Sequence, residues 1–179
     1  INGTYNLIKI CNELRNKNFL QISTDEVYGS IYEGSASENA PLNPSSPYSS
    51  SKASADLIVK SFVKTHGIHA IITRCSNNYG LNQNNEKMIP TIIQNISRDL
   101  PIPVYGNGKN IRDWLNVDDH IRAIWLAIKY GRQGEIYNIG GGEEMSNLDL
   151  IRKIGTAMQV PHPELIYVED RNCLLYTSP

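Results

Sequence analysis

Short apolar runs alternate with segments of helical periodicity along this sequence, and no other feature narrows the possible folds as much. FLQIS at 19–23 and AIITR at 70–74 have the length and composition of buried strands, and EIYNIGGG at 135–142 reads as a strand and a turn. Further strands are expected at 114–117 and 165–168, and helices at 4–14, 53–66, 89–100, 118–128 and from 146 onward. Strands joined through helices usually pair in parallel, so the sequence predicts an α/β fold.

Capping and helix-breaking residues mark the ends of these segments. Thr4 is a plausible N-cap for the first helix, and Asp118 and Asp119 are good capping residues for the fourth. Gly67 is expected to end the helix 53–66, whose predicted apolar face contains Leu57, Ile58, Phe62 and Val63. A Ser-, Pro- and Asn-rich loop spans roughly 30–47.

The composition excludes several classes of partner. The chain has 179 residues, of which 40% are hydrophobic, enough to bury a core. With 17 basic and 18 acidic residues the net charge is −1, so the sequence lacks the basic surface that binds nucleic acid. No apolar run approaches the roughly 20 residues of a membrane helix, and INGTYNLIKI lacks a secretion signal. We expect no nucleic-acid or membrane partner.

The three cysteines point to a reducing compartment. Cys11, Cys75 and Cys173 are odd in number and widely scattered, and they form no CxxC pair. The histidines also lack the spacing of metal ligands. The sequence therefore predicts a cytoplasmic protein without a metal site.

Tyr48 and Lys52 are the first candidate catalytic residues, because a spacing of four places both side chains on one face of a helix. A tyrosine ionises near pH 10, so a tyrosine base needs a neighbouring positive charge that favours the phenolate, and Lys52 has the right spacing. This spacing alone is weak evidence for a catalytic role, since any tyrosine and lysine four residues apart on a solvated helix face match the pattern.

Thr24, Asp25 and Glu26 strengthen this interpretation because they follow the expected strand FLQIS directly. Catalytic groups of open α/β sheets lie at the carboxyl ends of strands. Two carboxyl groups held close together cannot both ionise easily, so one can serve as an acid and the other as a base, which suits elimination of water. An isolated Asp-Glu pair would more often cap or solvate a turn.

A resemblance to a known family rests on six strings: STDEVYG, PYSSSKA, CSNNYG, NEKMIP, YGNGKNIRDWLNVDDH and EIYNIGGGEEMSN. From residue 1 to Arg171 the sequence resembles the extended short-chain dehydrogenase/reductases, and within them the dTDP-glucose 4,6-dehydratases. The order Thr-Asp-Glu together with YxxxK and RDW is specific to the dehydratases.

The resemblance implies a Rossmann-like doubly wound parallel sheet that binds NAD, with a smaller C-terminal domain for the sugar nucleotide. Residues 1–77 would be the remaining part of the NAD-binding domain, and 78–179 mostly the sugar-nucleotide domain, with 113–140 returning to the Rossmann sheet. The family's Gly-rich phosphate loop would lie upstream, so we expect the N-terminal strands to be missing and residues 1–179 alone to be inactive. The tail 172–179 continues no earlier pattern and is expected to be an artefact.

The resemblance also implies the reaction. Tyr48, helped by Lys52, would remove the proton of the glucose C4 hydroxyl while hydride passes to NAD. Glu26 would then take the acidified C5 proton and Asp25 would protonate the departing C6 hydroxyl, after which the hydride returns to C6. Thr24 would hold the C4 region of the sugar. The expected substrate is dTDP-glucose.

The same resemblance implies binding residues. Asn78 and Lys52 would contact the cofactor, and the sugar nucleotide would meet Asn77, Lys87, Tyr105, Arg112 and Asn147. Asn77 and Asn78 could instead be turn residues, since Ser-Asn-Asn before Tyr-Gly is good turn chemistry.

Structural roles are the alternatives to binding roles for Lys87, Arg112 and Trp114. Lys87 could be an exposed lysine, and Arg112 could form an ion pair with Asp113 or Asp119 rather than contact a diphosphate. Trp114 is expected in the core.

Three other possibilities stay open. The protein could act on UDP-glucose as a 4,6-dehydratase, act as a UDP-sugar 4-epimerase, or be a catalytically silent NAD-binding relative. Relatives pair as dimers through two long helices, here 3–16 and 53–66, so a homodimer is expected of the full-length protein.

Overall fold

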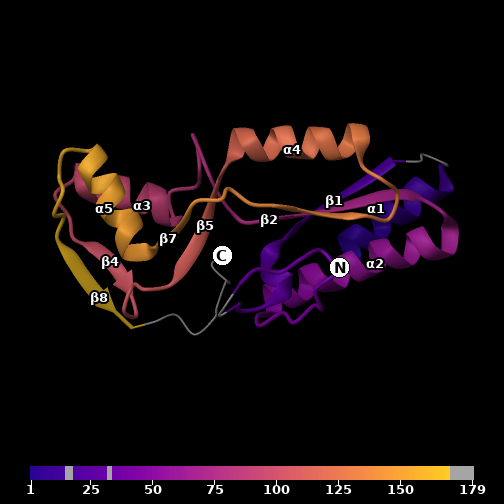
Figure 1. Ribbon diagram of the computed structural model, residues 1–179, viewed down its shortest axis with the longest axis horizontal. Coiled ribbons are helices and arrows are strands. Elements are labelled where there is room, and N and C mark those ends of the chain that lie inside the picture. The colour runs from indigo at the N-terminus through magenta and orange to yellow at the C-terminus, as the bar shows by residue number, and fades with distance from the viewer. Residues whose placement is uncertain (15–17, 32–33, 170–179) are drawn as a thin grey trace. The chain divides into compact units, whose positions relative to one another are not determined.

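The computed structural model describes residues 1–14, 18–31 and 34–169, which fall into two compact units (Figure 1). The first unit contains Ile1–Ser76 and Asp118–Gly140, and the second contains Asn77–Val117 and the described residues from Gly141 onward. The chain therefore leaves the first unit, builds most of the second, returns to the first and finally completes the second.

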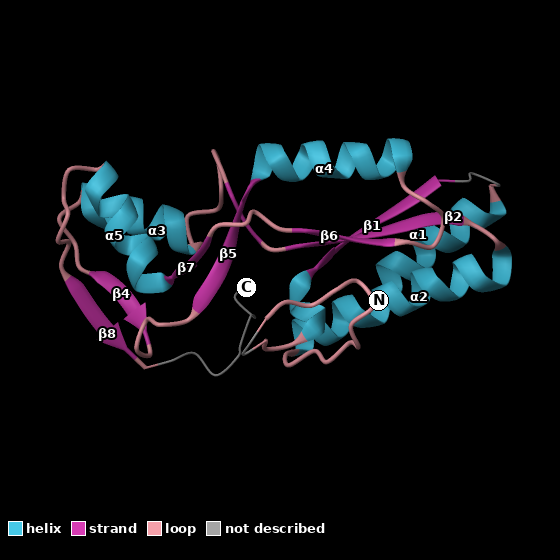
Figure 2. Cartoon of the chain, viewed as in Figure 1, coloured by secondary structure: helices cyan, strands magenta, loops and turns pink. Residues whose placement is uncertain are grey.

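The first unit is built on a three-stranded sheet in the order β1-β2-β6. Its strands are β1 (Asn18–Thr24), β2 (His69–Cys75) and β6 (Ile136–Ile139), and both pairings are parallel (Figure 2). This arrangement confirms the α/β fold with parallel strands. All three carboxyl ends lie at one edge of the sheet.

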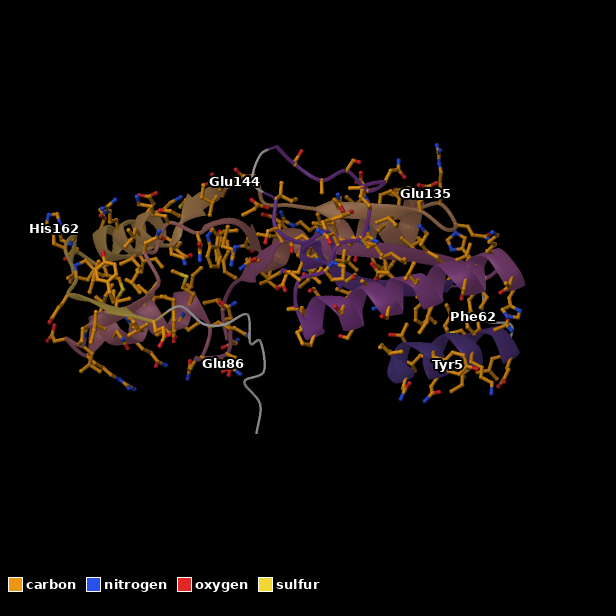
Figure 3. All side chains as sticks on the ribbon, turned by 90° about the horizontal axis from the view of Figure 1, so that it is seen from below. Tyr5, Phe62, Glu86, Glu135, Glu144 and His162 are labelled. Atoms are coloured by element: carbon orange, nitrogen blue, oxygen red, sulfur yellow. The ribbon has the colours of Figure 1, made fainter. Side chains whose placement is uncertain are left out.

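Helices cover both faces of this sheet (Figure 1). On one face lie α1 (Asn2–Glu13) and α2 (Pro47–His66), which bury Ile8 and Val59 against Ile72. Tyr5 of α1 and Phe62 of α2 meet edge to face, with ring centroids 5.9 Å apart (Figure 3). On the other face lies α4 (Val117–Tyr130).

The second unit combines two small sheets with two helices. Its strands are β3 (Asn77–Tyr79), β4 (Ile102–Tyr105), β5 (Ile111–Asn116), β7 (Glu144–Ser146) and β8 (Leu165–Val168). The sheet β3-β5-β7 pairs β3 with β5 in parallel and β5 with β7 antiparallel, whereas β4 pairs with β8 in parallel. The helices α3 (Met88–Ser97) and α5 (Asn147–Ala157) pack on a core that includes Trp114, which confirms its predicted burial.

Several predicted helix starts are wrong. Thr4 lies inside α1, because the Ile1 carbonyl already accepts from the Tyr5 N–H at 3.0 Å and so begins the helix a turn earlier. Asp118 and Asp119, predicted as capping residues, lie in the first turn of α4, where their negative charges interact favourably with the positive end of the helix dipole. The predicted helix 53–66 begins at Pro47 and ends, as expected, before Gly67.

Burial of the first strand and of the helix faces is less complete than predicted. Within the described residues β1 pairs only with β2, and Ile22 is exposed. Leu57, expected on the apolar face of α2, is exposed as well, and Ala53, Asp56 and Val59 form its buried side.

The structure also bears on the predictions about membrane helices and cysteines, whereas the predicted artefactual tail lies outside the described residues. No helix among residues 1–14, 18–31 and 34–169 is long and apolar enough to cross a membrane. Cys11 and Cys75 are free thiols. Cys173, Arg171 and the tail 172–179 lie outside the described residues.

Candidate active site

Thr24, Asp25 and Glu26 lie at the carboxyl end of β1, as the sequence predicts. Thr24 ends the strand and caps a short 3-10 helix, η1 (Asp25–Tyr28). Its hydroxyl accepts from the Glu26 N–H at 3.3 Å and donates to the Asp25 carboxylate at 3.2 Å. The threonine thereby fixes the turn that carries both carboxyl groups.

The turn after these residues depends on Gly29. Its φ of 79° is rarely accessible to other residues, and a Cβ there would overlap the backbone carbonyl of Asn43. Val27 and Tyr28 are buried with Ala53, the residue after Lys52. The carboxyl-bearing turn therefore packs directly on α2.

Tyr48 and Lys52 are placed by the start of α2. Ser46 and Ser49 form a reciprocal capping box, and Pro47 occupies the first turn, where its missing N–H costs nothing. Tyr48 is thus in the first turn and Lys52 one turn later. The Lys52 ammonium donates to the Ile22 carbonyl at 2.6 Å, which ties α2 to the end of β1.

The pKa of Tyr48 is raised, whereas the sequence analysis expected Lys52 to favour the phenolate and so to lower it. The phenol is 37% exposed, and its pKa is raised above 10.0, first by burial and then by negative charge on Glu26, Cys75 and Asp25. The Lys52 ammonium donates to the Ile22 carbonyl, and its positive charge does not outweigh these effects. The carboxyl groups thus lie near enough to the phenol to act on it electrostatically.

A buried polar network next to the site escaped the sequence analysis. The side chains of Asp56 on α2 and Arg74 on β2 are buried and form an ion pair of 3.0 Å. Arg74 also donates to the Tyr28 hydroxyl at 2.8 Å, and that hydroxyl donates to Asn138 at 2.8 Å. The sequence did contain a signal for this network. Arg74 ends the apolar run AIITR, and a charged residue in a buried strand needs a buried partner.

Burial and pairing act in opposite directions on Asp56. Burial raises the pKa of its carboxyl, whereas the nearby Ser23 hydroxyl, the hydrogen bond from Arg74 and the charges of Arg74 and Lys52 oppose that rise.

The remaining predicted site residues lie in the second unit. Asn77 and Asn78 belong to β3 and pair in register with Trp114 and Leu115 of β5. They are therefore strand residues, and the alternative that they form a turn is wrong. As neighbours in a strand they point to opposite faces of the sheet.

Tyr105, Arg112 and Asn147 surround one loop, residues 106–110. Tyr105 ends β4 just before it, and Arg112 follows it on β5. The Asn147 N–H donates to the Asn110 carbonyl at 3.1 Å. The structure thus brings these three residues to the same end of the second unit.

Lys87 and Arg112 differ in their ion pairing. Lys87 precedes α3 and forms an exposed ion pair of 3.4 Å with Glu86. The alternative that Arg112 forms an ion pair with Asp113 or Asp119 is wrong. The carboxylate of Asp113 instead accepts from the backbone N–H groups of Gly141 and Glu143. Asp119 pairs instead with Arg122.

A parallel sheet with a tyrosine–lysine pair and a carboxyl pair beside its strand ends defines a relative of the Rossmann-type short-chain dehydrogenases. The chain belongs to the GDP-mannose 4,6 dehydratase family, whose model matches residues 1–169.

Among members of this family, the chain is similar to several dTDP-glucose 4,6-dehydratases. A dTDP-glucose 4,6-dehydratase from Actinoplanes sp. is 51% identical over 153 residues, which are 86% of this chain and 48% of the relative. The crystal structure of dTDP-glucose 4,6-dehydratase from Bacillus anthracis in complex with NAD matches with a TM-score of 0.92 and 44% identity, over 95% of this chain and 55% of that chain.

Epimerases share the fold at lower identity. The UDP-glucuronic acid 4-epimerase from Bacillus cereus, in complex with UDP-glucuronic acid and NAD, matches with a TM-score of 0.87 and 29% identity, over 93% of this chain and 53% of that chain. The chain spans about half the length of the relatives it matches.

Proposed function

We propose that the protein converts dTDP-glucose to dTDP-4-keto-6-deoxyglucose, with NAD as cofactor and release of water. The observation that carries this proposal is the carboxyl pair Asp25 and Glu26 at the carboxyl end of β1, on a turn that packs against α2, the helix that carries Tyr48. Oxidation at C4 alone needs only the tyrosine, whereas elimination of water needs an acid and a base beside it. The names of the relatives support the same substrate.

The residues of the first unit fit a nicotinamide cofactor. Tyr48 and Lys52 share one face of α2 beside the carboxyl end of β1, where open α/β sheets bind nucleotides. The Lys52 ammonium has three donors, and the Ile22 carbonyl takes one, which leaves two suited to ribose hydroxyls. Asn78 would add a further contact. When bound, NAD accepts the hydride from C4 and returns it at C6.

The protein residues move the protons of this reaction. Tyr48 accepts the proton of the C4 hydroxyl as the C4–H bond breaks, which gives a 4-keto sugar with an acidic proton at C5. Glu26 takes that proton while Asp25 donates one to the C6 hydroxyl, which leaves as water. Thr24, which bonds to Asp25, holds the C4 region. For these transfers Asp25 would have to carry a proton and Glu26 a negative charge before elimination, a division that two adjacent carboxyl groups allow.

The second unit would bind the sugar nucleotide and the first would bind NAD. Arg112 and Lys87 suit the diphosphate, because a guanidinium or ammonium group pairs with phosphate oxygens. Lys87 would exchange its exposed partner Glu86 for the substrate. Asn77 would contact the sugar, and Tyr105 and Asn147, which lie beside the loop 106–110, would line the nucleotide pocket.

The same proposal includes a homodimer formed through α1 and α2. These helices leave large apolar side chains in solvent, namely Leu7, Ile10 and Leu14 of α1 and Leu57 of α2. Burial of apolar area stabilises association by roughly 25 cal/mol per Å², so a second copy would cover these residues favourably. The free thiols Cys11 and Cys75 support a cytoplasmic location for this dimer.

Three alternatives make different predictions. A UDP-sugar 4-epimerase has no use for an acid–base pair, and the matched epimerase is 29% identical whereas the matched dehydratases reach 44% and 51%. A silent relative would not need the complete set of Thr24, Asp25, Glu26, Tyr48 and Lys52. A dehydratase of UDP-glucose would share this set and differ only in its base contacts.

Product mass separates these possibilities. The protein, produced as its gene encodes it, is incubated with NAD and either dTDP-glucose or UDP-glucose. Loss of one water from dTDP-glucose, absent in Asp25→Asn, supports the proposal. Loss of water from UDP-glucose and not from dTDP-glucose would mean that the substrate is UDP-glucose. An epimerised sugar of unchanged mass would indicate an epimerase. No change in either sugar would indicate a silent relative.

A further inference from the structure

We infer that the side chains of Asp56, Arg74, Tyr28 and Asn138, here called the Arg74 network, position the carboxyl pair for elimination; the first three are buried and Asn138 is partly buried. These are positioning residues, since they would act through the turn that carries Asp25 and Glu26. The inference rests on the proposed dehydratase function.

Tyr28 connects the network to the carboxyl pair. It is the last residue of η1, the same short helix that begins with Asp25 and Glu26. Its ring is buried, and the Arg74 guanidinium lies 4.8 Å from the ring centroid. Its hydroxyl accepts from Arg74 and donates to Asn138, each at 2.8 Å. The far end of η1 is therefore held by two hydrogen bonds to two neighbouring strands.

Asp56 connects the network to the tyrosine base. Tyr48, Lys52 and Asp56 follow one another at intervals of four on α2 and so share a face. The carboxylate of Asp56 accepts from the Arg74 Nε at 3.0 Å. One guanidinium thus contacts both the helix of the base and the turn of the carboxyl pair.

Asn138 supports the network from β6. It pairs in register with Arg74, so both side chains start from adjacent positions in the sheet. Its amide donates to the Ala36 carbonyl at 3.0 Å, and its backbone N–H donates to the Glu38 carboxylate at 3.1 Å. The loop that packs over Tyr28 is thereby held in place as well.

The network should matter more for elimination than for C4 oxidation. Tyr48 and Lys52 are placed by the capping box and by the backbone of α2, whereas Asp25 and Glu26 stand on a turn of four residues. A small displacement of such a turn changes the approach of the carboxyl groups to C5 and C6, and a misplacement of about 1 Å can cost up to a hundredfold in rate.

The test removes only the Tyr28 hydroxyl. Tyr28→Phe keeps the buried ring, and Tyr137→Phe is the matched control, because Tyr137 lies next to Asn138 and its hydroxyl accepts only from the Arg132 N–H within the described contacts. The protein is produced as its gene encodes it. Turnover of dTDP-glucose, absorbance of reduced cofactor during turnover, and amide hydrogen exchange of residues 24–29 are measured for both variants.

We expect kcat of Tyr28→Phe to fall about tenfold with KM unchanged, and reduced cofactor to accumulate because elimination becomes slower than oxidation. Exchange in residues 24–29 should be faster than in the control. A general loss of structure would lower kcat without such accumulation. Equal kcat in both variants, or a loss without accumulated cofactor and without faster exchange, would overturn the inference.

Two further arms keep the test decisive. If the wild-type protein releases no water from dTDP-glucose, the proposed function fails, and the exchange of residues 24–29 alone decides whether the network holds the turn. If Tyr28→Phe does not fold, Asn138→Ala replaces it, since this change removes the acceptor of the Tyr28 hydroxyl and should give the same pattern.

Discussion

At the level of single residues, the proposed base Tyr48 would have to lose its proton in surroundings that oppose the loss. Burial and the charges of Glu26, Cys75 and Asp25 all raise its pKa, and the positive charge of Lys52, whose ammonium donates to the Ile22 carbonyl, does not outweigh them. The protein residues alone therefore keep the phenol protonated near neutral pH. The positive charge of an oxidised nicotinamide beside the phenol would lower that pKa, which links deprotonation to cofactor binding.

Neutralising Glu26 should lower the pKa of Tyr48. Glu26→Gln removes the largest charge contribution to the raised pKa, so the phenolate forms at lower pH. Because elimination is then slowed by about a hundred- to ten-thousandfold, oxidation at C4 can be followed directly as reduced cofactor. Its pH midpoint should lie lower than in Asp25→Asn, which also slows elimination but removes a smaller charge contribution to the pKa of Tyr48. An unchanged midpoint would contradict the electrostatic description of the site.

His120 should make the protein less stable at acidic pH. Burial lowers the pKa of its imidazole below 6.5, so the folded state favours the neutral ring. The resulting stability is fully present above about pH 6.5 and is lost as the pH falls through the lowered pKa, because the unfolded chain binds the proton more readily. The free energy of unfolding, measured with denaturant, should decline less in His120→Gln than in the exposed control His162→Gln. Parallel curves for the two variants would exclude this role.

At the scale of elements, the site depends on how η1 and α2 begin and end. Thr24 caps η1, Gly29 ends it, and the Ser46–Ser49 capping box begins α2. The positions of catalytic side chains on these elements therefore depend on local backbone chemistry as much as on core packing.

Alanine at Gly29 should be far more costly than alanine at Gly67. Both glycines have positive φ, of 79° and 67°, but a Cβ at Gly67 would meet nothing within 4 Å, whereas one at Gly29 would overlap the Asn43 carbonyl. We expect about 1 kcal/mol for Gly67→Ala and more than about 2 kcal/mol for Gly29→Ala. Denaturant unfolding measures both losses, and equal values would show that the turn is not tightly packed.

Local patterns predicted much of this architecture and part of the site. The apolar runs marked β1, β2 and β6, and Thr24, Asp25 and Glu26 were located because they follow a strand directly. The spacing of Tyr48 and Lys52 sufficed to place both on one helix face.

Contacts between distant segments could not be predicted in the same way. The ion pair of Asp56 with Arg74 and the bond from Lys52 to Ile22 depend on how α2 lies against the sheet, which no local pattern contains. Leu57 was expected on the apolar face of its helix and is exposed, because periodicity locates such a face without showing what covers it.

At the scale of the whole molecule, the exposed apolar faces of α1 and α2 bear on assembly. Leu7 is 61% exposed although it belongs to a helix that packs on the sheet through Ile8. Such a surface is typical of a subunit interface.

Leu7→Glu should therefore dissociate the proposed dimer. A carboxylate on this surface would lose its hydration on association, which is unfavourable without a partner charge. Sedimentation velocity should show a monomer for Leu7→Glu and a dimer for Leu81→Glu, in which the same change is made at a leucine that is 94% exposed in the second unit. A dimer in both variants would place the interface elsewhere.

If oxidation, elimination and reduction all occur at one site, the hydrogen removed from C4 of the sugar must reappear at C6 of the product. The protein is incubated with NAD and dTDP-glucose that carries deuterium at C4, and the product is analysed by NMR and mass spectrometry. We predict a product that has lost water and carries the deuterium at C6. Deuterium that stays at C4 or returns there, in a sugar that has lost no water, would contradict the account.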